Sequence, residues 1–117
     1  MIGQLHSVVF DASDPAGLAE FYIQLLGARV VTREDDWVVI VDTEGRRLAF
    51  QRAPQHEPPK FPDPKGSQQM HLDVLVDDID KAEREVLKLG AARLPGEGED
   101  FQVFADPAGH PFCLVTD

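Results

Sequence analysis

The sequence predicts an α+β protein built from two tandem βαβββ modules, and three observations indicate this architecture. The chain repeats three landmarks at offsets of 65, 63 and 64 positions: a histidine that opens an apolar run, a Leu-Gly pair that closes a helical pattern, and an Asp-x-x-Gly turn. Each half reads as a strand, a helix and then short strands. The 117 residues, 43% of them hydrophobic, suit one ordinary domain with a buried core.

The first half is expected to begin with a strand at 5–10 and a helix at 15–26. Ser13 or Asp14 can cap this helix, and Pro15 suits its first position, where a missing backbone N–H costs nothing. A stripe of apolar residues at helical spacing should face the core, at Leu18, Phe21, Tyr22 and Leu25. Short strands are then predicted at 30–33, 37–41 and 47–51.

The second half repeats this order, with a strand expected at 70–76 and a helix at 79–89. The buried stripe of the helix is predicted at Ile79, Ala82, Val86 and Leu89. Short strands are predicted near 93–94, at 101–105 and at 112–116. Five of the nine prolines fall between the halves, so that segment is expected to be a stiff linker. We therefore predict one domain, 1–117, with module one at 1–53, the linker at 54–67 and module two at 68–117.

Acidic charge narrows the partners that the chain can have. Eleven Lys and Arg residues against 21 Asp and Glu residues give a net charge of −10 at pH 7. This argues against nucleic acid and anionic membranes, which need clustered basic residues. No apolar run is long enough to cross a bilayer, and no secretory signal pattern is expected. Because Cys113 is the only cysteine, a disulfide framework is excluded, and we expect a cytoplasmic protein.

Four segments carry a family resemblance: His-Ser-Val-Val-Phe at 6–10, Phe-Tyr-Ile-Gln-Leu-Leu-Gly at 21–27, Gln-Met-His-Leu-Asp-Val at 69–74 and Asp-Pro-Ala-Gly-His-Pro-Phe at 106–112. The chain resembles the vicinal oxygen chelate superfamily, which includes glyoxalase I, bleomycin and fosfomycin resistance proteins and extradiol dioxygenases. It looks most like the small glyoxalase-like branch. The resemblance implies a curved mixed sheet that forms a cup, with helices outside, a small organic molecule in the cup and a homodimer.

The resemblance also implies where a metal would bind. Members that use a metal take one ligand from the first strand and one from the last strand of each module, which here are His6, Gln51, His71 and Cys113. If a divalent metal is bound (zinc, nickel, iron or manganese), His6, Gln51 and His71 are expected to hold it, with water or Cys113 completing the site. A site without metal, where both histidines hydrogen-bond a ligand, is equally open. Cys113 is otherwise a small buried apolar residue.

Two classes of function follow. The first is a metal-dependent lyase or isomerase, for which Asp73 is the candidate base because alternation places it on the same side as His71. The second is a metal-free protein that binds or sequesters a small molecule, as bleomycin resistance proteins do. The metal lyases of the superfamily carry glutamate where Cys113 stands, so glyoxalase I activity is not expected, and neither is extradiol dioxygenase activity. An accessory dimer without a ligand is a third possibility.

Three further residues are candidates for the ligand pocket. Trp37 either lines the cup or packs under a helix. Arg47 either faces the cup, which would favour an anionic or carbonyl-bearing ligand, or is solvated. Phe61, the large apolar residue of the linker, either closes over the cup or anchors the linker.

Overall fold

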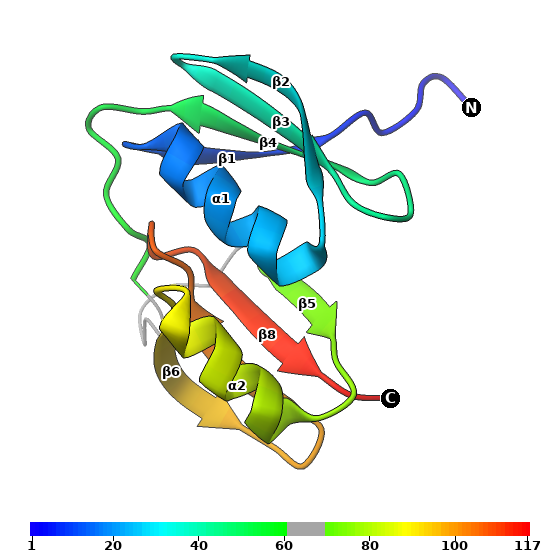
Figure 1. Ribbon diagram of the computed structural model, residues 1–117, viewed down its shortest axis with the longest axis vertical. Helices are drawn as coiled ribbons and strands as arrows, with labels where there is room; N and C mark the ends of the chain where they lie inside the picture. Colours follow the sequence, from blue (N-terminus) through cyan, green and yellow to red (C-terminus); the bar gives the residue numbers. More distant parts are fainter. Residues whose placement is uncertain (61–69) are drawn as a thin grey trace. The chain divides into compact units, whose positions relative to one another are not determined.

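The computed structural model describes residues 1–60 and 70–117, which form two compact units, 1–56 and 57–117 (Figure 1). Each unit has a strand, a helix and three further strands, which confirms the predicted α+β fold of two repeated modules. The hydrogen-bonded ladders form one mixed four-stranded sheet in each unit. Phe61, the candidate lid residue, lies outside the described residues.

The N-terminal unit pairs its strands in the order β1-β4-β3-β2. Its elements are β1 (Val8–Ala12), α1 (Pro15–Leu26), β2 (Arg29–Glu34), β3 (Trp37–Val41) and β4 (Arg47–Arg52). β1 and β4 are parallel, and the other pairs are antiparallel. The predicted start of the first strand at residue 5 is wrong, because the ladder between β1 and β4 begins with the pair Val8 and Leu48. His6 therefore precedes the strand on which it was expected.

The C-terminal unit repeats this topology in the order β5-β8-β7-β6. Its elements are β5 (Leu72–Leu75), α2 (Ile79–Lys88), β6 (Ala92–Glu97), β7 (Phe101–Ala105) and β8 (Pro111–Val115). β5 and β8 are parallel, as β1 and β4 are. His71 comes one position before β5, and thus also outside the strand that was expected to carry it. In both units the first strand lies beside the last, so residues far apart in the sequence become neighbours.

Helix ends follow local chemistry. The Asp14 carboxylate accepts a hydrogen bond of 3.1 Å from the Gly17 backbone N–H at the start of α1, and Gly27 ends that helix with φ 64°. The Asp78 carboxylate caps α2 in the same way, through the Lys81 N–H. The prediction that Leu89 is buried is wrong, since α2 ends at Lys88 and the side chain of Leu89 remains 37% exposed.

Each sheet packs one face against its own helix (Figure 1). In the N-terminal unit the rings of Phe10, Tyr22 and Phe50 meet there, with centroids 5.3–5.7 Å apart. In the C-terminal unit the fully buried rings of Phe104 and Phe112 stack on the same side of the sheet as Leu114. Because side chains alternate along a strand, their neighbours point to the opposite face, which we call the open face of each sheet.

The two Asp-x-x-Gly segments form the turns that precede β4 and β8. Asp42 accepts hydrogen bonds from the backbone N–H groups of Glu44 and Arg46, and Asp106 accepts them from Ala108 and His110. Burial raises the pKa of the Asp42 carboxyl, but these backbone hydrogen bonds and the Arg46 guanidinium outweigh burial and hold that pKa below its ordinary value. The same hydrogen bonds from backbone N–H groups to an aspartate carboxylate therefore form the turn in both modules.

The closing glycines of these turns, Gly45 and Gly109, have φ 84° and 91°, so an alanine at either position is expected to cost about 1 kcal/mol of stability from the left-handed backbone alone. A Cβ at Gly45 meets nothing within 4 Å, whereas one at Gly109 collides with Pro58. Gly109→Ala should therefore lower the free energy of unfolding by about 1–3 kcal/mol more than Gly45→Ala. Urea denaturation of both variants measures the difference. Equal losses would show that Pro58 moves aside.

Candidate functional site

The open face of the C-terminal sheet carries a hollow of about 470 Å³. Its apolar lining comes from Phe101, Val103 and Val115, on β7 and β8. Three polar side chains, His71, Asp73 and Cys113, line it as well, together with Pro95, Gly96, Asp100 and Thr116. We call this the open-face hollow. An apolar surface with a few convergent polar groups is the usual composition of a small-molecule site.

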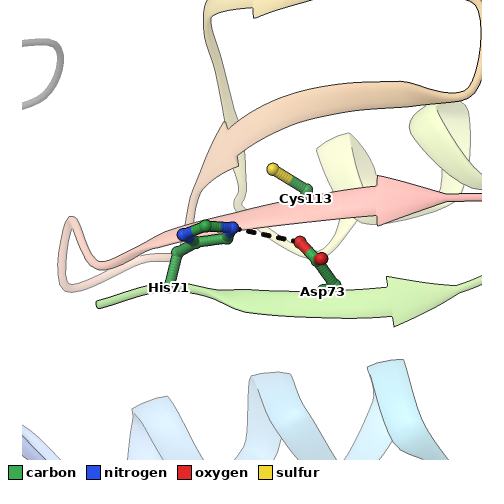
Figure 2. Close-up of side chains that lie close together, drawn as sticks. All are labelled: His71, Asp73 and Cys113. Carbon is green, nitrogen blue, oxygen red and sulfur yellow. Dashed lines mark ion pairs between the residues drawn. The ribbon is translucent and has the colours of Figure 1, made fainter. Parts of the chain in front are cut away.

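Strand register brings the three polar side chains together. Asp73 on β5 is the Cα partner of Cys113 on β8, so their side chains leave the sheet side by side. His71 lies two positions before Asp73 and therefore points to the same face. Figure 2 shows the three side chains close together, Asp73 on β5, Cys113 on β8 and His71 just before β5. Sequence alternation predicted that His71 and Asp73 share a face, and the family resemblance placed Cys113 at the same site as His71. The structure brings all three together.

The cluster is compact and open to solvent on one side. His71 Nε2 lies 3.1 Å from Asp73 Oδ1, and one ligand atom from each of the three residues lies within 4.8 Å of the others. The side chains of His71 and Asp73 are 40% and 58% exposed, whereas Cys113 is buried. A solute can thus reach the carboxylate and the imidazole, while the sulfur forms part of the floor.

The surroundings of Cys113 raise the pKa of its thiol. Burial raises the pKa of this thiol, and both the negative charge of Asp73 and the hydrogen bond to its carboxylate raise it further. A nucleophilic cysteine needs a lowered pKa and a basic neighbour. These surroundings favour the neutral thiol over the reactive thiolate.

The charge of the hollow is acidic. Asp73 and Asp100 both line it, and no lysine or arginine does so among the described residues. Gly96, which lines the hollow, is held by Gln102: the Nε2 of Gln102 donates to the Gly96 carbonyl at 3.4 Å. The Oε1 of Gln102 accepts a hydrogen bond of 2.8 Å from Arg93. Arg93 also forms an ion pair of 2.8 Å with Glu97, so its guanidinium already has partners outside the hollow.

In the N-terminal unit, the structure does not bring together the two residues that were predicted as metal ligands. His6 is exposed, and its Nδ1 lies 3.1 Å from Ser7 Oγ. Gln51 pairs with Asp11, close to the other end of β1. The register also shows that Gln51 is not the counterpart of Cys113. Cys113 pairs with Val103 on β7, and the residue at the matching place in β4 is Ala49, which pairs with Val39 on β3.

The two remaining candidates, Trp37 and Arg47, lie at opposite ends of the β3–β4 ladder. Their Cα partners are Gln51 and Val41, so both side chains belong to the open face. Trp37 therefore does not pack under α1, which was one of its two predicted positions. Arg47 is half-buried, and its Nε is enclosed without a hydrogen bond among the described residues.

Sequence reasoning missed most of the lining of the open-face hollow. Val103, Phe101 and Asp100 come from β7 and the turn before it, which carry no motif of their own. The one available signal was alternation, because Phe101 and Val103 share a face and Val115 shares one with Cys113. Which face of β7 meets that of β8 follows only from their pairing.

Comparison with known proteins decides the family. The family model of the glyoxalase-like domain matches residues 7–115. The chain belongs to the glyoxalase-like domain family. The resemblance seen in the sequence is thereby confirmed. A search of curated proteins gave no significant match.

Several solved structures share the fold of this glyoxalase-like domain. A fosfomycin resistance protein, FosX, from Mesorhizobium loti is 20% identical with a TM-score of 0.73, covering 100% of this chain and 94% of that one. A glyoxalase/bleomycin resistance protein/dioxygenase family enzyme from Burkholderia phytofirmans is 20% identical with a TM-score of 0.71, over 94% and 95% of the two chains. A hypothetical protein from S. aureus is 18% identical with a TM-score of 0.72, over 100% and 96%. At these identities the likeness shows the fold.

Membrane insertion through a helix finds no support in the glyoxalase-like domain. Neither of its two described helices has the length and apolar character that a bilayer crossing requires.

Proposed function

We propose that this glyoxalase-like domain binds a small organic molecule, neutral or positively charged, in the open-face hollow. The observation that carries the proposal is the pairing of an apolar floor with the cluster of His71, Asp73 and Cys113. The floor supplies area for burial, and the exposed carboxylate and imidazole supply orienting hydrogen bonds. The protein then acts by binding its ligand. The family named for the similar structure from Burkholderia phytofirmans includes bleomycin resistance proteins.

Acidic lining defines the class of molecule. A carboxylate or phosphate ligand would meet Asp73 and Asp100 with no cation in the lining to balance them. An amine or alcohol can instead donate to Asp73, whose side chain is 58% exposed. This ligand class differs from the anionic or carbonyl-bearing ligand that one of the two predictions for Arg47 favoured, and Arg47 belongs to the other unit.

A lyase of the glyoxalase I type fits the residues less well. In the metal lyases of the superfamily a glutamate on the last strand both binds metal and moves a proton. Here that position holds Cys113, and its counterpart in β4 is Ala49. Asp73 is the only carboxylate in the described cluster, and it already contacts both His71 and Cys113. Metal-dependent lyase or isomerase chemistry is the alternative, and it would reveal itself as turnover that requires an added metal.

A thermal-shift screen in the presence of a chelator tests the proposal. The probes are matched sets of small amines, alcohols and carboxylates on the same aromatic or aliphatic scaffolds. We expect amines or alcohols to stabilise the protein by about 2.7 kcal/mol at a concentration one hundred times the dissociation constant. The carboxylates on the same scaffolds should give no thermal shift. Asp73→Asn should remove the preference for amines.

Glu34→Gln is the matched control, because it removes one negative charge from an exposed residue of β2 in the other unit. It should leave the preference unchanged. Stronger binding of the carboxylates, or equal effects of the two variants, would contradict the proposal. Turnover upon addition of metal would favour the alternative instead.

The homodimer and the cytoplasmic location stay predictions. β1 and β5 are outer strands of their sheets in the described ladders, and such strands can pair with a further strand. Sedimentation velocity of the full chain measures the oligomeric state directly.

A further inference from the structure

We infer that the C-terminal unit by itself binds one zinc ion, through His71, Asp73 and Cys113. The inference uses the same hollow as the proposed function, but it does not rest on the organic molecule proposed there. It differs from the set expected from the resemblance, His6, Gln51 and His71, in which both modules contribute. Asp73 takes the place of the ligands that the N-terminal unit does not assemble.

Distances in the cluster suit a small ion. Zinc binds nitrogen and oxygen at about 2.0–2.2 Å and sulfur at about 2.3 Å, so two ligands of a tetrahedral site lie roughly 3.3–3.8 Å apart. His71 Nε2 and Asp73 Oδ1 are 3.1 Å apart, and no pair among the three chosen ligand atoms exceeds 4.8 Å. Shifts of about one ångström, within the reach of side-chain rotation, convert the cluster into a binding site. His71 and Asp73 are exposed and free to make them.

The donor set selects the metal. An imidazole and a thiolate are borderline and soft ligands, which favour zinc over magnesium, calcium or manganese. The Asp73 carboxylate is a hard ligand, but zinc accepts carboxylate oxygen as well. Binding moves the thiol proton of Cys113 to solvent, and the resulting thiolate and the Asp73 carboxylate together balance the two positive charges of the ion. Three protein ligands beside a hollow leave one position for water or another small ligand, the arrangement of catalytic rather than structural zinc sites.

The N-terminal unit offers no equivalent. Ala49 stands where Cys113 stands in the repeat, and Val9, its Cα partner on β1, stands where Asp73 stands. Neither side chain can bind a metal. Of the described residues, the grouping of His71, Asp73 and Cys113 is the one in which three metal-binding side chains of His, Cys, Asp or Glu converge. Of the two repeated modules, the second therefore carries the metal ligands and the first does not.

Cobalt and zinc titrations of the full chain, reduced and stripped with chelator, test the inference. Cobalt(II) should bind with a stoichiometry of one and show tetrahedral d–d bands together with a thiolate-to-cobalt charge-transfer band. Zinc should displace it. Asp73→Asn, at an exposed position that does not threaten folding, should weaken zinc binding by more than about 100-fold, and so should His71→Ala. Cys113→Ser should remove the charge-transfer band, with far-ultraviolet circular dichroism confirming that the variant is folded.

His6→Ala is the matched control and should bind zinc like the parent protein. A loss of binding in His6→Ala as large as that in His71→Ala would overturn the inference and restore a site shared by both units. Absence of zinc binding to the parent protein at micromolar concentrations would overturn it as well. Because the screen for organic ligands is run with chelator and these titrations without organic ligand, either proposal can fail alone.

Discussion

Replacing Val115 with tryptophan is expected to abolish the thermal stabilisation by any organic ligand that the chelator screen identifies. Val115 lines the open-face hollow, and its Cα partners Leu75 and Phe101 are 63% and 36% exposed. The indole therefore finds room at the surface of the sheet and occupies the space of the ligand, without entering the core behind it. Apparent affinity should fall by more than about 100-fold, which corresponds to the loss of roughly 3 kcal/mol of apolar contact. Isothermal titration calorimetry measures the loss.

Val31→Trp provides the comparison, since Val31 is an exposed valine of β2 in the other unit. It should leave the affinity of the ligand within twofold of the parent value. If Val115→Trp binds the ligand normally, the open-face hollow is not the binding site. If both variants lose binding to the same degree, the effect is general and not local.

Phe50→Ala is expected to lower the free energy of unfolding by about 3–5 kcal/mol, the range found when a fully buried aromatic residue is truncated. Phe50 is 0% exposed, and its ring contacts those of Phe10 and Tyr22 at centroid distances of 5.5 and 5.7 Å. Domains of this size are stable by about 5–15 kcal/mol, so the variant should be marginally folded. Guanidinium denaturation followed by circular dichroism measures the change.

Gln51→Ala tests the next residue of the same strand. Its side chain is exposed on the open face, so the free energy of unfolding should change by less than about 0.5 kcal/mol. Gln51 was predicted as a metal ligand, but it lies on β4 opposite Asp11, near the end of β1 that is farther from His6. Zinc binding should therefore be unchanged too. A stability loss comparable to that of Phe50→Ala would contradict the assignment of the two faces.

Local chemistry was readable from the sequence. The bounds of α1 at Pro15 and Leu26 follow from the cap Asp14, the proline after it and the glycine at its end, and the structure has the same bounds. The repeated turns also follow from residues within a few positions of one another. Even the shared face of His71 and Asp73 is local, because side chains along a strand alternate with a period of two residues.

The ends of the strands, and the burial of residues just beyond the helices, were harder to predict from the sequence. The first strand was predicted to begin at residue 5, because the apolar pattern of Leu5 continues into 8–10, but the ladder begins at Val8. Leu89 matched the apolar spacing of α2 yet stays exposed, since the helix ends before it. A pattern shows which residues are apolar, whereas the partner strand and the helix length decide which of them are covered.

The sequence by itself determined the family, the two repeated modules and that His71 and Asp73 point to the same side of the sheet. Only the tertiary structure decided that Asp73 and Cys113 are direct partners on neighbouring strands, and that Ala49, not Gln51, occupies the matching place in β4. The reason is that the register between β5 and β8 is set by hydrogen bonds between segments about 40 positions apart, which no local pattern encodes. A slip of one residue would have turned Cys113 to the opposite face and left the open-face hollow without its sulfur.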